Sequence, residues 1–357
     1  MYGPRMERKH QGSSAPRRAA PPPPPARAFL PTSRAELEAR GWDGIDVLLV
    51  TGDAYIDHPA FGAAVIGRVL EAQGYRVGVV AQPDWRTTAD VLRLGKPRLL
   101  VGVTSGAMDS MVNHYTAQKR RRSDDAYTPG GEAGRRPDRA TAVYARLCRK
   151  AFGPTVPIVL GGIEASLRRI AHYDYWDDRI RPSILIDSGA DLLVYGQGEK
   201  PILEIARRLA MGEDVCGLVD VPGTAVAVAH DELAQLDGRS RGVVALPAFE
   251  EVVTDRRRYA EFSRLYHLEH NGDNARVMVQ RIPHMLAVAP PRSVMVPLKL
   301  SFRASSPSSR STEASDRLAT SRPWCSVMQQ KAQPAAQPRR IWIDQRICSS
   351  AGMWAPP

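Results

Sequence analysis

The sequence predicts an α/β fold of the doubly wound type, with a mostly parallel central sheet. Three observations predict it. Five short apolar runs recur between residues 46 and 195, a helix-like stretch usually follows each run, and each run ends at small, polar or glycine-containing residues. Such runs are typical of parallel strands that crossover helices bury on both faces. Because ligands of these sheets bind beyond the carboxyl ends of the strands, the turns are the expected site.

The apolar runs and the helical patterns give the elements in order. Strands are expected at residues 46–50, 76–81, 98–103, 156–160, 191–195 and 224–229. Helices are expected at residues 61–72, 88–94, 138–152, 201–211 and 250–269, with short ones after Ser33 and within 107–117. Gly74 suits the end of the first long helix, and Pro201 suits the first position of another.

The basic charge of the chain is concentrated in its tails. Residues 1–28 carry a net charge of +5 and residues 281–357 carry +8, which leaves −2 of the total of +11 for residues 29–280. Nucleic-acid binding requires a basic face on a folded element. The charge distribution therefore indicates solvated basic tails, and no nucleic-acid partner is expected.

The same composition divides the chain into four parts. Residues 1–28 read as a disordered Pro/Arg-rich leader, and residues 29–230 as the α/β domain. Residues 231–280 read as a linker with a polar helix. Residues 281–357 contain ten prolines and twelve serines without a helical or strand period, so this segment is expected to be disordered.

Neither a membrane segment nor a thiol site is expected from the sequence. No apolar run approaches the length of a membrane span, and the N-terminus has no hydrophobic signal core, so a cytoplasmic protein is expected. The four cysteines are Cys148, Cys216, Cys325 and Cys348, and their spacing fits neither a zinc site nor a disulfide framework. The sequence gives no indication of the oligomeric state.

The first two candidate turns follow the first and third strands. Thr51, Gly52, Asp53, Asp57 and His58 connect the first strand to its helix. One interpretation is that His58 or a neighbouring carboxylate contacts a cofactor; the other is that Asp57 caps the helix and His58 is a turn residue. Both remain open. Thr104 and Ser105 end the third strand and are expected to face the same ligand.

Two further turns combine glycines with an acidic residue. Gly161, Gly162 and Glu164 follow the fourth strand, and Gly196, Gly198 and Glu199 follow the fifth. Glycines let the backbone approach a ligand closely, and Glu164 could bind a sugar hydroxyl or lie at a helix N-terminus, which attracts anions. The alternative is a pair of tight strand-to-helix turns. Because neither segment is a GxGxxG fingerprint, the pattern does not support NAD binding of the usual kind.

Two charged segments remain. Arg168–Asp178 contains His172 and several carboxylates, for which we favour a structured loop with local ion pairs over a metal site; anion binding by its arginines stays open. Lys119–Arg139 is a long charged loop, which is usually either functional or mobile. Its run Lys119–Arg122, followed by two aspartates, is more typical of a self-neutralising surface loop.

Several long motifs carry a family resemblance. They are VTGDAYIDHPAFG, VGVVAQPDW, RLGKPRLLVGVTSGAMDSMVNHYTA, DDAYTP, RPDRATAVY, VLGGIEASLRRIAHYDYWDD and ILIDSGADLLVYGQGEKPILEIARRLAMGE. In this order they closely resemble the N-terminal half of YgiQ-type radical SAM proteins, over about residues 29–280. The resemblance implies a Rossmann-like domain akin to the corrinoid-binding-like domains that precede some radical SAM barrels.

The resemblance also implies cofactors that this chain does not match. In full-length family members a CxxxCxxC motif in a following barrel holds a 4Fe-4S cluster that cleaves S-adenosylmethionine, and this sequence has no such motif. We interpret the chain as a truncated or frameshifted member that performs no radical chemistry as written, which leaves its status as an enzyme open. The alternatives are a stand-alone module that binds a nucleotide-like or corrinoid small molecule, with Asp53, His58, Glu164 and Glu199 in one crevice, and a non-functional fragment.

Overall fold

The computed structural model describes residues 29–228, 242–269, 275–282 and 284–288. The predictions for the leader 1–28 and for the tail beyond residue 288 lie outside the described residues. In chain order the elements are α1 (Arg34–Ala39), β1 (Val47–Thr51), α2 (Gly62–Ala72), β2 (Val77–Ala81), α3 (Ala89–Leu92), β3 (Leu100–Thr104), α4 (Ser110–His114), η1 (Pro129–Gly131), α5 (Ala140–Phe152), β4 (Ile158–Leu160), α6 (Gly162–Leu167), β5 (His172–Asp174), β6 (Arg179–Arg181), α7 (Ile184–Ser188), β7 (Leu192–Val194), α8 (Glu199–Ala210), η2 (Val215–Gly217), β8 (Thr224–Val228), β9 (Val243–Leu246), α10 (Phe249–Thr254), α11 (Arg256–Leu268), β10 (Val277–Ile282) and β11 (His284–Val288).

The main sheet has its described strands in the order β2-β1-β3-β4-β7-β8-β11-β10-β9. The first five strands are parallel to one another, and β8 joins β7 in the antiparallel sense. Taken in chain order, the five parallel strands lie as second, first, third, fourth and fifth, which is one of the two common doubly wound arrangements. The predicted mostly parallel α/β sheet is confirmed. The strand order reverses between β1 and β3, and this point positions the site.

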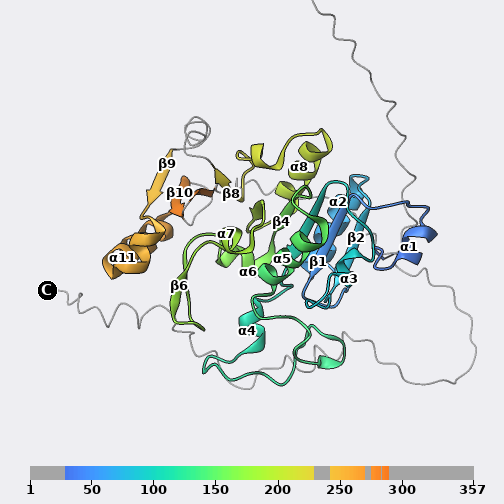
Figure 1. Cartoon of the computed structure of the whole chain (residues 1–357), viewed down its shortest axis with the longest axis horizontal. Helices are drawn as coiled ribbons and strands as arrows, with labels where there is room; N and C mark the ends of the chain where they lie inside the picture. The colour runs from blue at the N-terminus through green and yellow to red at the C-terminus, as the bar shows by residue number, and fades with distance from the viewer. Residues whose placement is uncertain (1–28, 229–241, 270–274, 283, 289–357) are drawn as a thin grey trace, which may run out of the picture. The chain divides into compact units, whose positions relative to one another are not determined.

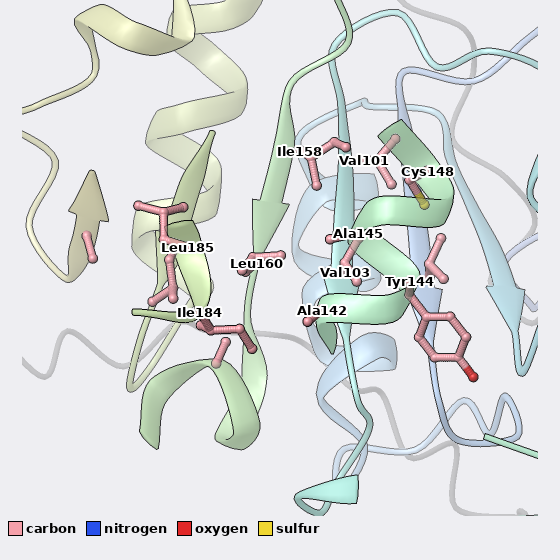
Figure 2. Packing of buried hydrophobic residues seen from close by; sticks show 14 of the residues in the cluster. Val101, Val103, Ala142, Tyr144, Ala145, Cys148, Ile158, Leu160, Ile184 and Leu185 are labelled. Carbon is pink, nitrogen blue, oxygen red and sulfur yellow. The ribbon is translucent and has the colours of Figure 1, made fainter. Parts of the chain in front are cut away.

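Helices cover both faces of the parallel part of this sheet (Figure 1). Along β1 the side chains alternate between two cores: Leu48 and Val50 pack with α5, whereas Val47 and Leu49 pack on the side of α2 and α8. Such alternation is the geometry of a strand buried on both faces. Figure 2 shows the first core, in which Tyr144 and other α5 side chains lie near side chains of β3 and β4.

Several helical predictions need correction. The predicted helix 250–269 is two helices, because Asp255 has an extended backbone and its carboxylate accepts a hydrogen bond from the Arg257 amide to cap α11. Helix α8 begins at Glu199, so Pro201 is its third residue. Helices α6 and α7 and the separate hairpin of β5 and β6 were not expected from the sequence, and each of these elements is only three to six residues long.

The strand predicted at 224–229 is not the last one. Strand β9 lies within the predicted linker, β10 begins in it and ends at Ile282, and β11 lies within the range predicted to be disordered. The prediction of disorder is therefore wrong for residues 281–282 and 284–288. Strand β11 pairs with both β8 and β10. The boundary predicted at residue 230 therefore does not separate two sheets. No helix among the described residues is long and apolar enough to cross a membrane.

Candidate functional site

A pocket of about 440 Å³ lies at the carboxyl ends of β1, β3, β4 and β7. The first residues of α2, α6 and α8 form the rest of its wall. This is the switch point of the sheet, where open α/β folds bind their ligands. The volume falls within the range of about 300–1,000 Å³ that is common for small-molecule sites.

Eight of the thirteen predicted site residues line this pocket. They are Thr51, Asp53, Thr104, Gly161, Gly162, Gly196, Gly198 and Glu199. The other five predicted residues, which are Gly52, Asp57, His58, Ser105 and Glu164, lie outside its lining. The four acidic and imidazole side chains expected in one crevice are therefore separated, since Asp53 and Glu199 reach the pocket but His58 and Glu164 do not.

Asp57 and His58 have local roles at the entry to α2. The Asp57 carboxylate pairs with Arg68 of that helix, and the exposed His58 accepts a hydrogen bond at Nδ1 from the Ala60 amide, at 3.1 Å. The N-cap of α2 is Phe61, so Asp57 does not cap the helix. The turn interpretation of His58 holds, whereas the capping interpretation of Asp57 is wrong.

Glu164 is a buried structural residue. Its side chain has no exposed surface, and its Oε2 accepts hydrogen bonds from the Ser110 amide at 2.8 Å and the Ser110 hydroxyl at 2.5 Å. Its Oε1 accepts from the Thr141 amide at 2.9 Å. Amides in the first turns of α4 and α5 thus share one carboxylate, which satisfies donors that helices leave unpaired at their N-termini. The interpretation of Glu164 as a sugar-binding residue is wrong.

Asp53 is held beside the pocket by a buried ion network that the sequence analysis missed. Its Oδ1 lies 2.9 Å from Nη1 of Arg136, and its Oδ2 accepts a hydrogen bond of 2.6 Å from the Ala107 amide. Arg136 also donates to the Ser105 carbonyl and, through Nε and Nη2, to both oxygens of Asp125. Two carboxylates therefore share one guanidinium whose side chain is fully buried.

Burial sets the protonation behaviour of Asp53. Desolvation raises the pKa of this carboxyl above its usual range, while the positive charge of Arg136 and the hydrogen bond from Ala107 act in the opposite direction. The neighbouring backbone leaves little room: a Cβ on Gly52 would lie 2.2 Å from the Ser105 carbonyl oxygen, and one on Gly106, at φ +109°, would lie 2.0 Å from the carboxylate itself. Because these two glycines have no Cβ, the turns after β1 and β3 can approach each other and Asp53 closely.

The long loop Lys119–Arg139 is anchored to this network. Ala54 donates a backbone hydrogen bond of 2.9 Å to Tyr127, and Gln82 donates to the Thr128 hydroxyl at 2.7 Å and to the Gly52 carbonyl at 3.0 Å. Asp125 pairs with the buried Arg136. It does not neutralise the adjacent basic run, so the interpretation of a self-neutralising surface loop is wrong for Asp125. No sequence signal marks Arg136 as buried.

The predicted charged cluster Arg168–Asp178 is a structured region with internal ion pairs. Asp174 pairs with Arg139 and Arg181, and Arg168 pairs with Asp109. Burial and, secondly, the charge of Arg168 lower the pKa of His172 to about 4. Local pairing therefore accounts for this region, as the sequence analysis favoured.

The described residues do not fit a metal centre or an iron-sulfur cluster. They contain no group of three or more His, Cys, Asp or Glu side chains that could hold a metal ion. Within them, Cys148 is buried and Cys216 is exposed, on different elements. A 4Fe-4S cluster needs several thiolates close together. Cys325 and Cys348 lie outside the described residues.

The fold and the pocket define a class of protein: an open α/β domain whose binding pocket lies at the switch point of its sheet. The comparisons with known proteins then identify the family. The Radical SAM N-terminal family matches residues 29–315, and the chain belongs to this family. The resemblance to YgiQ-type proteins is confirmed at this level.

The relatives found are longer than this chain. A UPF0313 protein of Bradyrhizobium diazoefficiens is 56% identical over 71% of this chain and 40% of its own length. A UPF0313 protein of Pseudomonas aeruginosa is 47% identical over 71% of this chain and 41% of its own length. The chain thus spans about 40% of the length of the curated relatives it matches.

A solved structure was also matched. It is the radical S-adenosylmethionine methyltransferase TsrM from Kitasatospora setae, in a structure with tryptophan substrate and a SAM analogue bound. The identity is 24%, the TM-score is 0.35, and the match covers 51% of this chain and 28% of that chain.

Proposed function

We propose that this chain is the N-terminal, ligand-binding part of a radical SAM protein, and that its pocket binds a small nucleoside-like molecule without a phosphate group. The observation that carries the proposal is the pocket at the switch point, with the Asp53 carboxylate in its wall. A 4Fe-4S cluster and S-adenosylmethionine belong, in this proposal, to residues other than the described ones. That the chain is truncated or frameshifted stays a prediction.

The charges around the pocket favour a ligand without phosphate. Among its described lining residues, none is Lys, Arg or His, and Asp53 and Glu199 are the acidic ones. The N-termini of α2, α6 and α8 each supply at most roughly half a positive charge. With its carboxyls ionised, the network of Asp53, Asp125 and Arg136 carries one net negative charge, and Glu199 adds another. These two negative charges outweigh the three helix ends, which supply at most roughly one and a half positive charges.

The shape and polarity of the pocket favour a heterocycle with hydroxyl groups. Apolar side chains of β1, β3 and β4 form the pocket floor, which suits a flat ring. The carboxylate of Asp53 and the hydroxyls of Thr51 and Thr104 each accept one hydrogen bond from a backbone amide. Their remaining lone pairs can accept hydrogen bonds from ligand hydroxyl or amino groups. A corrinoid that uses a histidine as its metal ligand does not fit, because the exposed His58 lies outside the pocket lining.

Enlarging Gly161 tests the pocket. This glycine lines it in extended backbone at φ −157°, and an added Cβ meets no atom within 4 Å. Gly161→Asn is expected to keep the cap of α6 and to weaken adenosine binding at least tenfold by occupying the pocket, as measured by equilibrium dialysis. Gly44→Asn, which also meets no atom within 4 Å, adds the same side chain elsewhere and is the control.

The choice of probes decides between the candidate ligands. Adenosine is expected to bind more tightly than adenosine 5′-monophosphate, because the phosphate would approach Asp53 and Glu199. Equal binding of the two probes, or unchanged adenosine binding by Gly161→Asn, would contradict the proposal. Binding of hydroxocobalamin with no binding of adenosine would instead support the corrinoid alternative.

A further inference from the structure

Two segments that are far apart in the chain meet outside the pocket and form what we call the aromatic-basic surface: residues 115–122 and 172–181. In the first segment Tyr115 and Arg121 form an antiparallel bridge, and the Arg122 amide donates 2.7 Å to the His114 carbonyl. The second segment is the hairpin of β5 and β6. The basic run Lys119–Arg122 is therefore held on an ordered turn.

Specific contacts join residues 115–122 to the turn of the hairpin. The Tyr175 hydroxyl donates to the Ala117 carbonyl at 2.7 Å, and Nζ of Lys119 donates to the Trp176 carbonyl at 3.2 Å. Lys119 also lies over the Tyr175 ring, 4.8 Å from its centroid, and Trp176 packs edge-on against Tyr115 and Tyr175. These contacts hold Lys119 against the aromatic rings of the two segments.

The aromatic rings of this surface remain accessible. Tyr173 is 40% exposed and Tyr175 is 46% exposed, although both belong to structured elements. The hydroxyl of Tyr173 is bound to Asp178 and that of Tyr175 to a backbone carbonyl, so their polar groups are already satisfied. The hydroxyls are therefore engaged, and the exposed ring surfaces are available for contacts with a ligand.

The basic run carries charge that its surroundings do not neutralise. Lys119, Arg120, Arg121 and Arg122 are all exposed, and none of them forms an ion pair with a described carboxylate. Two of the three acidic residues of the hairpin, Asp174 and Asp177, pair with Arg139 and Arg181. The third, Asp178, accepts a hydrogen bond from the Tyr173 hydroxyl. Four adjacent positive charges thus face solvent beside the exposed tyrosines.

We propose that the aromatic-basic surface binds single-stranded nucleic acid. Proteins bind single strands by combining a basic track for the phosphates with aromatic rings on which bases stack. Lys119–Arg122 would contact phosphates, and Tyr175, with Tyr173 beside it, would stack bases. This proposal revises the expectation of no nucleic-acid partner, because that expectation placed the basic charge in the tails and found no basic face on a folded element.

The test compares charge reversal at the surface with the same change elsewhere. Binding of fluorescein-labelled oligouridine to the full chain is measured by fluorescence anisotropy over a range of salt concentrations. Arg120→Glu/Arg121→Glu is expected to weaken binding at least tenfold and to lower the slope of log K against log salt by about 1.4 for the two lost contacts. The control Arg256→Glu/Arg257→Glu reverses two exposed charges of α11 and leaves the same tails in place. It is expected to have a much smaller effect.

A second comparison isolates stacking from charge. Tyr175→Leu is expected to weaken oligouridine binding about tenfold and to leave binding of an abasic strand of equal length unchanged, since only bases stack. Tyr175→Phe keeps the ring and is expected to retain most of the affinity. The proposal is overturned if both charge-reversal variants lose affinity equally, which assigns binding to net charge. It is also overturned if polyglutamate or the abasic strand binds as tightly as oligouridine, because the surface would then attract any polyanion.

Discussion

Replacing Arg136 with methionine is expected to destabilise the protein by about 3–5 kcal/mol, because the change leaves two buried carboxylates without their shared counter-ion. Asp53 and Asp125 are 3% and 1% exposed, so little water can take the place of the guanidinium. Such a loss is a large fraction of the stability of about 5–15 kcal/mol that is usual for a folded protein. Urea denaturation followed by circular dichroism measures it.

The pH dependence of this effect has a definite sign. The pKa of Asp53 is already raised in the folded protein, and removing the positive charge of Arg136 raises it further. A carboxyl whose pKa is higher in the folded than in the unfolded protein lowers the free energy of unfolding when the pH is above its folded-state pKa. This destabilisation disappears as the pH falls toward the pKa of the unfolded state. The stability difference between Arg136→Met and the unchanged protein is therefore expected to shrink in mild acid.

Arg135 provides the matched control for Arg136. It is the adjacent residue, its side chain is 52% exposed, and it pairs with the exposed Glu132. Arg135→Met is expected to change the unfolding free energy by less than about 1 kcal/mol, as is usual for surface ion pairs. If the two variants had equal stability at neutral pH, the buried network would not hold the loop to β1.

Replacing Glu164 with alanine is the second change with a large expected effect. The Ser110 and Thr141 amides would lose their acceptor inside the protein, and the Ser110 hydroxyl would lose one of its partners. Each buried donor left unpaired costs about 1–3 kcal/mol, so a total loss of at least about 3 kcal/mol is expected from urea denaturation. Glu164→Gln retains one acceptor oxygen and is expected to lose about half as much.

The exposed Glu38 of α1 offers the comparison for Glu164. Its side chain is 68% exposed and forms one surface ion pair, so Glu38→Ala is expected to be nearly neutral. If Glu164→Ala kept its stability but lost adenosine binding, Glu164 would be a ligand residue, and the structural role assigned to it would be wrong.

Local pattern was sufficient to predict the parallel strands. The apolar runs around Val47–Val50 and Ile158–Leu160 are buried on both faces, so their hydrophobic residues are continuous and easily recognised. Strands β9, β10 and β11 were missed because they are short, only four to six residues, and no helix-like stretch of the βαβ pattern separates β10 from β11. The break at Asp255 was missed because the helix-like polar pattern continues on both sides of it, although aspartate is a common N-cap residue.

The pocket was predictable to the extent that it depends on strand ends. Thr51, Thr104, Gly161 and Gly196 follow strands directly, and parallel strands bring their carboxyl ends to one edge. Glu164 follows a strand too, but the first turn of α6 directs it into the core. Arg136 reaches the site from a loop whose path depends on tertiary contacts, so no local pattern marks it.

The position of β11 has a consequence for the order in which the protein acquires its structure during synthesis. Strand β11 is the last described strand in the chain, yet it lies between β8 and β10 and pairs with both. The parallel half can assemble as soon as α8 has left the ribosome, whereas β9 and β10 cannot join it through β11 until residue 288 has been translated. Roughly 60 residues separate the end of β8 from the end of β11, and translation proceeds at about 5–20 residues per second. One edge of β8 therefore stays unpaired for several seconds. An unpaired strand edge can pair with another chain, so the partly made protein is most exposed to aggregation during that interval.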